Sequence, residues 1–246
     1  MHNTMWSAVA GSMYQMRRLD VIANNLANAN TPGFRADRME FSTYLSQVRT
    51  EDFAGYRDSL SELNQLISTH TDYKPGVIRQ TGNPLDMAIA GDGYFVVQTP
   101  DGPLYTRAGN FEFDVAGQIV TGDGFILRGE GGPIQIREGL PFEIDENGAV
   151  FQEQDEVGRV QIMEIANPET LQKVGNKRFK ASAETRVRVS ENPRIMQRAL
   201  EGSNVDAVRE MTHMVQTGRA FESYQRVISL VNNINQQANS KLSNFS

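Results

Sequence analysis

Residues 24–34 read NNLANANTPGF, with four asparagines in seven positions followed by an abrupt stop. Asparagine is a mediocre helix former because its amide competes for backbone groups, yet the residues before this stretch have helical spacing. Apolar or small residues recur in steps of four and three at Met5, Val9, Ser12, Met16, Leu19, Ala23 and Leu26. Proline cannot continue a helix and glycine tolerates a left-handed turn. The sequence therefore predicts a long helix that ends in a chain-redirecting turn at Thr31, Pro32, Gly33 and Phe34.

A second helical pattern occupies the C-terminal end of the chain. Its apolar positions are Val205, Val208, Met211, Val215, Phe221, Tyr224, Val227, Ile228, Val231, Ile234 and Ala238. Ser203 or Asn204 is a candidate N-cap, and only Gly218 interrupts the pattern. Because each helix carries one apolar seam, we expect the two to pack as a coiled-coil-like pair.

Between the helices the period changes from helical to alternating. Short apolar runs such as YFVVQ (94–98), FILR (125–128) and VQIMEI (160–165) are separated by glycine-rich turns. Closely spaced strands of this kind are typical of an all-β module. The predicted fold class is α+β, with two long terminal helices and a central all-β domain. The predicted boundaries are a helix in 1–34, a connector in 35–76, the β domain in 77–182, a connector in 183–202 and a helix in 203–246.

Composition excludes several classes of function. The 246 residues contain no cysteine, which excludes disulfides and thiol nucleophiles, and the three histidines lie far apart. The net charge of −6 argues against a nucleic-acid binder, which is normally basic. No apolar stretch reaches about 18 residues, the length of a membrane span. The N-terminus lacks the basic start of a secretory signal, so we expect export without a cleaved signal peptide.

No catalytic motif stands out from this background. The stretch GDGFILRGEGG (122–132) lacks the glycine register of a phosphate loop, and hairpin turns explain it. The sequence DENG (145–148) lacks the further oxygen ligands of a calcium loop and indicates a β-turn. Neither His70 nor His213 has a nucleophile elbow nearby. We expect no catalytic, cofactor-binding or metal site, and no enzyme.

The asparagines have an explanation in a contact between helices. Asn24 and Asn28 lie one turn apart with Asn25 beside them, and an amide both donates and accepts. An apolar 4–3 rhythm more often reflects an ordinary core, but small residues and amides in the first helix favour an assembly surface. The predicted assembly residues are Met16, Leu19, Ile22, Ala23, Asn24, Asn25, Leu26, Asn28, Phe221, Tyr224, Ile228 and Val231.

Three separate motifs resemble one protein family. LDVIANNLANANTPGF (19–34) closely resembles the N-terminal signature of bacterial flagellar axial proteins, the rod and hook class. The resemblance continues through QTGNPLDMAIAGDGYFVVQTPDG and YTRAGNF, and resumes at LEGSNVDAVREMTHMVQTGRAFESYQRVI. It extends over nearly the whole chain, with the motifs in the family's order.

The resemblance implies a structural subunit of the flagellar basal-body rod that polymerises helically and transmits torque from motor to hook. The implied partners are copies of itself, other rod subunits and the flagellar type III export apparatus, with neither nucleic acid nor a membrane span. The implied location is the rod in the periplasmic space. Length and opening helix resemble the proximal rod protein more than the distal one, and both readings stay open. The competing hypothesis from another class is a β-domain enzyme or binding module with a helical dimerisation stalk.

Overall fold

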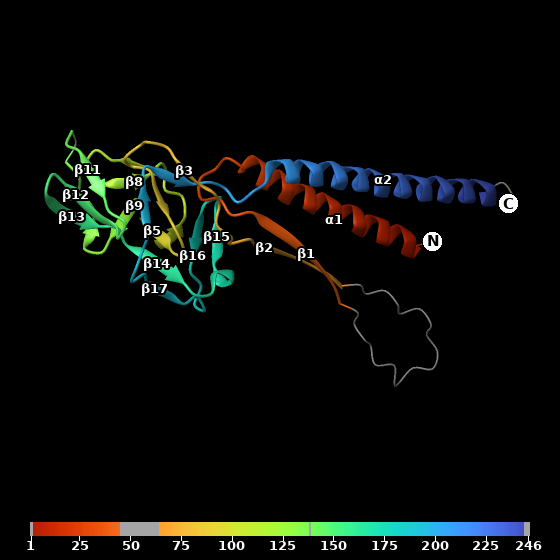
Figure 1. Ribbon diagram of the computed structural model, residues 1–246. Helices are drawn as coiled ribbons and strands as arrows, with labels where there is room; N and C mark the ends of the chain where they lie inside the picture. Colours follow the sequence, from red (N-terminus) through yellow and green to blue (C-terminus); the bar gives the residue numbers. More distant parts are fainter. Residues whose placement is uncertain (1, 45–63, 138, 244–246) are drawn as a thin grey trace, which may run out of the picture. The chain divides into compact units, whose positions relative to one another are not determined.

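The computed structural model describes residues 2–44, 64–137 and 139–243 (Figure 1). The chain divides into two compact units. The first, which we call the helical unit, comprises Met1–Leu26, Asp37–His70 and Ala207–Ser246. The second, the β domain, comprises Ala27–Ala36 and Thr71–Asp206. The β domain is therefore assembled from two stretches that lie on either side of an insertion.

The helical unit contains two helices and one pair of strands. Helix α1 spans His2–Ala27 and helix α2 spans Ala207–Ser243. Strands β1 (Asp37–Tyr44) and β2 (Asn64–Thr71) form a two-stranded sheet. Both strands lie in the stretch expected to be a connector. Neither of the two helices, within the residues described, is long and apolar enough to span a membrane.

The fold is α+β, but the expected coiled-coil-like pair is wrong. A coiled coil buries its seam by inserting each apolar side chain between residues of the facing helix. Here the seam positions Met16, Val208 and Val215 are more than half exposed. The helices do approach each other, since a methyl group on Gly11 would lie 2.5 Å from the Tyr224 ring. The heptad rhythm therefore marks apolar helix faces that the chain covers only in part.

The β domain is built from short antiparallel strands. They are β3 (Ile78–Gln80), β4 (Met87–Ile89), β5 (Tyr94–Thr99), β6 (Gly102–Thr106), β7 (Phe111–Phe113), β8 (Ile119–Thr121), β9 (Ile126–Gly129), β10 (Gly132–Pro133), β11 (Phe142–Ile144), β12 (Ala149–Gln152), β13 (Asp155–Arg159), β14 (Ile162–Ile165), β15 (Gln172–Val174), β16 (Arg178–Lys180), β17 (Val187–Val189), β18 (Ile195–Gln197) and β19 (Ala199–Glu201). A 3-10 turn, Pro168–Thr170, with proline at its start, lies between β14 and β15.

The strands form one large sheet and several small ones. The large sheet has the order β15-β16-β6-β5-β9-β8-β7, with β14 pairing β5 and β17. A three-stranded sheet has the order β11-β12-β13. Strands β18 and β19 return from the C-terminal side to pair with β4 and β3 at the start of the domain. The domain is therefore closed by pairs of strands that are distant in sequence.

Strand β5 lies between the two apolar cores of the β domain. Phe95 and Val97 belong to the larger core, and Tyr94 and Val96 to the smaller one. Because side chains alternate across a strand, the YFVVQ run fills both cores at once. The Phe95 ring meets Phe111 edge-on at a centroid distance of 5.3 Å.

We predict that Phe95→Ala lowers the free energy of unfolding of the β domain by about 3–5 kcal/mol, because it leaves a cavity in a close-packed core. Urea denaturation followed by circular dichroism measures the change. The control is Val189→Ala on the edge strand β17, a half-exposed site, where we expect a change within about 0.5 kcal/mol. Equal losses at both sites would contradict this placement of the core.

Candidate assembly surface and the junction beside it

The chain leaves α1 through a tight turn built around Gly33. The N–H of Thr31 donates to the carbonyl oxygen of Asn28 at 3.1 Å, and Gly33 has a φ of +69°. A methyl group on Gly33 would collide with the backbone of Ala108. The Gly33 N–H donates to the backbone oxygen of Glu201 at 2.8 Å. The turn therefore requires glycine for both its conformation and its close contact.

Phe34 is fully buried directly after this turn. The ammonium nitrogen of Lys173 lies 4.3 Å from the centroid of the Phe34 ring. The same nitrogen donates to the backbone oxygen of Arg35 at 2.8 Å. A cation over an aromatic face is attracted by the ring quadrupole, so Lys173 holds two consecutive residues of the exit segment.

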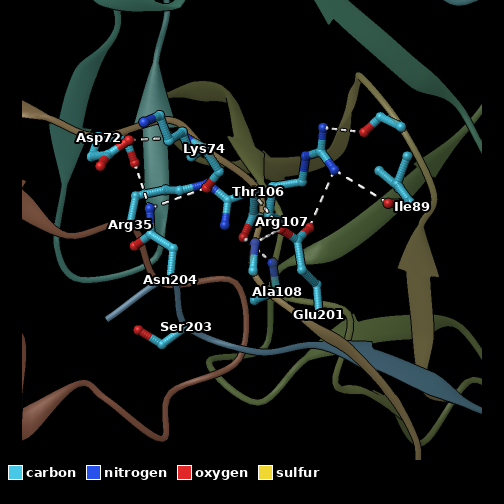
Figure 2. A network of polar contacts seen from close by, with 12 residues as sticks. Arg35, Asp72, Lys74, Ile89, Thr106, Arg107, Ala108, Glu201, Ser203 and Asn204 are labelled. Atoms are coloured by element: carbon cyan, nitrogen blue, oxygen red, sulfur yellow. Dashed lines mark hydrogen bonds and ion pairs between the residues drawn. The ribbon is translucent and has the colours of Figure 1, made fainter. Parts of the chain in front are cut away.

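Two buried arginines share one carboxylate behind the turn. Glu201 accepts from Nη2 of Arg35 at 2.6 Å and from Nη1 of Arg107 at 3.2 Å, as Figure 2 shows. The side chains of Arg35 and Glu201 are 1% exposed and that of Arg107 is 6% exposed. The backbone N–H of Gly76 donates to the same carboxylate at 2.8 Å. We call Arg35, Arg107 and Glu201 the buried triad.

Arg107 has further partners in the β domain. Its guanidinium donates to the backbone oxygens of Ile89 at 3.3 Å and Gly91 at 2.7 Å. Its central carbon lies 5.1 Å from the centroid of the Tyr94 ring. Burial lowers the pKa of Arg107, and the charge of Glu201 opposes that shift. Burial also raises the pKa of Tyr94, which Arg107 partly opposes.

The buried triad carries two positive charges and one negative charge. In the part of the chain that the structure describes, Nε of both arginines and Nη1 of Arg35 have no hydrogen-bond partner. Removing charges from water costs several kcal/mol per ion, and mutual attraction offsets that cost only with good geometry. Loss of Glu201 would leave two buried cations without a counter-charge, so the whole arrangement depends on this carboxylate.

Asn204 joins three segments next to the triad. Its side-chain oxygen accepts from the N–H of Ala36 at 2.8 Å. Its amide nitrogen donates to the backbone oxygens of Asp72 and Lys74, which Figure 2 labels. The N–H of Asp72 also donates to the backbone oxygen of Ala36 at 2.8 Å. We call residues 31–36, 72–76 and 199–204 the junction, because the chain passes between its two units through these three segments.

The predicted assembly residues differ in burial within the single chain. Met16, Ala23 and Asn24 are exposed; Leu19, Leu26, Phe221, Tyr224, Ile228 and Val231 are half-buried; Ile22, Asn25 and Asn28 are buried. In the turn, Thr31 and Pro32 are half-buried, and Gly33 and Phe34 are buried. Contact of the exposed members with neighbouring subunits stays a prediction.

Asn25 has a role inside the chain that the sequence did not indicate. Its amide nitrogen donates to the backbone oxygen of Asp37 at 2.9 Å, and its side-chain oxygen accepts from the N–H of Asp37 at 3.0 Å. A side-chain amide can satisfy both backbone groups of one residue in this way. Asn25 therefore fixes the first residue of β1 against α1.

Both helices expose apolar side chains beyond the predicted set. Trp6 and Met13 are exposed on α1, and Met211, Leu230 and Ile234 are exposed on α2. Contiguous apolar surface on a protein marks an interaction site more often than isolated exposed residues do. Met211 and Ile234 belong to the predicted seam of the second helix, which we expected to pair with the first helix, whereas Trp6, Met13 and Leu230 lie outside both predicted seams.

Titratable groups also gather at a pocket of about 260 Å³ in the β domain, lined in part by Tyr94, Arg107, Glu164 and Arg188. Perturbed titratable groups in a pocket are a reason to consider chemistry. Here Arg107 is engaged by the triad, and Glu164 accepts from Arg188 and Ser190. Within residues 2–44, 64–137 and 139–243, no three histidine, aspartate or glutamate side chains are placed to hold a metal ion.

Comparison with known proteins identifies three family regions. Residues 6–35 match the family described as flagella basal body rod protein, residues 88–152 the flagellar hook protein FlgE/F/G D1 domain, and residues 196–241 the flagellar basal body rod FlgEFG protein C-terminal region. The chain is 33% identical to flagellar basal-body rod protein FlgG of Bacillus subtilis (strain 168), over 96% of this chain and 98% of that protein. It is also 33% identical to flagellar basal-body rod protein FlgF of Escherichia coli (strain K12), over 99% of each.

The chain belongs to the flagellar basal-body rod protein family. Each member of the buried triad lies in a different matched region of this rod-family chain. Arg35 ends the first region, Arg107 lies in the second and Glu201 lies in the third. The triad therefore joins all three family regions at one buried point.

The triad was not among the residues predicted from the sequence, and Asn204 was expected only as a candidate helix N-cap, whereas its side chain bonds Ala36, Asp72 and Lys74. All four lie in or directly beside the motifs TPGF, YTRAGNF and LEGSN that carry the family resemblance. The signal that could have indicated these residues was a charged side chain in or beside a motif whose other residues are mostly apolar or small. The pairing itself could not be predicted, since Arg35 and Glu201 are 166 positions apart.

We predict that Glu201→Gln lowers the free energy of unfolding by about 3–5 kcal/mol, the cost of leaving buried charge without its partner. The matched control is Glu164→Gln, which removes an ion pair of the same 2.6 Å length with the exposed Arg188. There we expect a loss below about 1 kcal/mol. Chemical denaturation measures the free energy of unfolding of both variants. Similar small losses would show that the triad contributes no more to stability than the Glu164–Arg188 pair does.

A second prediction compares two glycines of positive φ. Gly33 (φ +69°) contacts the Ala108 backbone, whereas Gly82 (φ +82°) has open space where a methyl group would be. Gly82→Ala should cost only the conformational penalty of about 1–2 kcal/mol. Gly33→Ala should cost clearly more, because the collision displaces the exit turn. Thermal unfolding of both variants measures the difference, and equal midpoints would refute the close contact.

Proposed function

We propose that this chain is a structural subunit of the flagellar basal-body rod, most like the proximal rod protein, that polymerises helically and transmits torque from motor to hook. The observation that carries the proposal is the apolar surface left open on both helices of a chain that belongs to the rod family. Open helix faces allow a heterologous contact, in which one surface meets a different surface on the next subunit and the array continues to grow.

The proposal extends to route, location and chemistry. The subunit passes through the flagellar type III export apparatus without losing a signal peptide, and it resides in the rod within the periplasmic space. It has no catalytic role, since its junction uses charged groups for structure. Its partners are copies of itself and other rod subunits. A distal rod subunit is the alternative within the family, and relatives named FlgF and FlgG match at the same 33% identity.

The direct experiment is to locate a tagged copy of the protein in purified basal bodies and to measure its intact mass there. The proposal expects it in the rod, on the motor side, with its first helix intact. Recovery on the hook side would favour the distal rod alternative. A protein that is absent from basal bodies, or that forms stable dimers with an active β domain, would support the stalked enzyme or binding module instead.

We predict that Leu26→Asp or Val231→Asp blocks rod assembly while the β domain stays folded. A charge buried without a partner between helices costs several kcal/mol, and neither side chain belongs to the two apolar cores of the β domain. The same result is expected for Leu19 and Tyr224. Ser229→Asp, at an exposed position of α2, is the control and should assemble.

Motility assays and rod isolation, with circular dichroism of the β domain, measure this effect. Normal rods with Leu26→Asp, or loss of the sheet signal in that variant, would contradict the assignment of these residues to assembly.

A further inference from the structure

Two hairpins of the β domain repeat each other in sequence and register. Residues 111–120 read FEFDVAGQIV and residues 142–151 read FEIDENGAVF. In the first hairpin, β7 pairs with β8 so that Phe111 faces Thr121. In the second, β11 pairs with β12 so that Phe142 faces Gln152. All these positions differ by 31, so the two hairpins are equivalent along their whole length.

Their turns have the same hydrogen bonds. Asp114 accepts from the N–H groups of Ala116 and Gln118 at 2.9 and 2.7 Å, and Asp145 accepts from Asn147 and Ala149 at the same distances. The following glycines, Gly117 and Gly148, have φ of +75° and +84°. We call residues 114–117 the first tip and residues 145–148 the second tip.

The second tip holds an extended segment of its own chain, strand β18. The N–H of Ile195 donates to the backbone oxygen of Glu146 at 2.8 Å. The side-chain oxygen of Gln197 accepts from the N–H of Ile144 at 3.2 Å. The Ile195 side chain covers Gly148, where an added methyl group would lie 3.0 Å from its Cδ1. The second tip is therefore a docking site for an extended segment with an apolar residue and an amide two positions later.

The equivalent groups of the first tip are open. Val115 corresponds to Glu146 and Phe113 to Ile144. Among the residues that the structure describes, the backbone oxygen of Val115 and the N–H of Phe113 have no hydrogen-bond partner. The Val115 side chain is fully exposed. A groove of about 590 Å³ lies beside this tip, lined in part by Val115, Gly117 and the apolar Leu140.

The charges of the groove complement the segment that fills the second tip. Glu153 and Asp155 are exposed in the groove wall together with Arg137. Strand β18 is flanked by Arg194 and Arg198. Opposite charges placed around a docking site select the partner and its orientation. A groove with two carboxylates to one guanidinium therefore fits an extended segment with basic flanks.

We propose that the first tip and its groove are a docking site for an extended segment of another polypeptide, with an apolar side chain, a side-chain amide two residues later and basic flanks. The segment donates a backbone N–H to the oxygen of Val115 and accepts the N–H of Phe113 with its side-chain amide, as Ile195 and Gln197 of β18 do at Glu146 and Ile144. That the polypeptide is a neighbouring rod subunit rests on the proposed function; the site itself does not.

A peptide copy of β18 tests the site on the isolated protein. The probe is the peptide NPRIMQRA, residues 192–199, titrated into ¹⁵N-labelled protein and followed by amide chemical shifts. We expect saturable shifts at Val115, Ala116 and Gly117, absent with a peptide in which the isoleucine is aspartate. The double variant Glu153→Gln, Asp155→Asn should weaken binding several-fold. Unshifted first-tip amides at millimolar peptide, or shifts confined to Gly148, would overturn the proposal.

A photo-crosslinking amino acid at position 115 tests the partner in assembled basal bodies. We expect a crosslink from position 115 to an extended, basic-flanked segment of a second polypeptide, identified by mass spectrometry. The matched control is position 146, where we expect crosslinks only within the chain, to β18. If the protein is in the rod but position 115 gives no intermolecular crosslink, the docking site is wrong and the proposed function stands. If the protein is absent from basal bodies but binds the peptide, the proposed function is wrong and the docking site stands.

Discussion

The carboxylate of Glu201 lies between two buried guanidinium groups, and the rest of the chain depends on that contact. Glu201 is the last residue of β19, and its partners come from the exit of α1 and from the loop after β6. A buried ion pair is weak evidence for stability, because desolvation offsets most of its attraction. Its stronger effect is to restrict the chain to one folded arrangement. Neither arginine can be buried in another arrangement without losing its counter-charge, so the exit turn and the approach to α2 must close on the β domain together.

The two units have different kinds of surface. The β domain has two apolar cores of its own, formed around β5. The helices instead leave Trp6, Met13, Leu230 and Ile234 in solvent. Open apolar surface of this kind is a liability for a monomer and an advantage for a subunit that will be enclosed by neighbours.

Much of this arrangement follows from local patterns in the sequence. Helical spacing located both helices, and alternating runs such as YFVVQ located the β domain. The pairing of strands that are distant in sequence leaves no local pattern, and the sequence analysis therefore did not predict it. Strands β18 and β19 are three residues long and pair with segments more than 100 positions away, so no period marks them. The heptad rhythm led to the mistaken coiled-coil pair, because periodicity shows that a face is apolar and does not show what covers it. Arg35, Arg107 and Glu201 lie in recognisable motifs, but only the folded chain brings their charges together.

Residue-resolved hydrogen exchange on the free subunit tests the central claim. The claim is that the junction folds together with the β domain, whereas the helices become stable only in contact with neighbouring subunits. Lone helices are marginally stable in water. The account predicts that the amides of Gly33, Ala36 and Gly76 exchange as slowly as those of Phe95 and Val97, since all open only with global unfolding. Amides of α2 between positions 208 and 234 should exchange much faster. Fast exchange at Gly33 and Gly76 with a protected core, or helices as protected as β5, would contradict it.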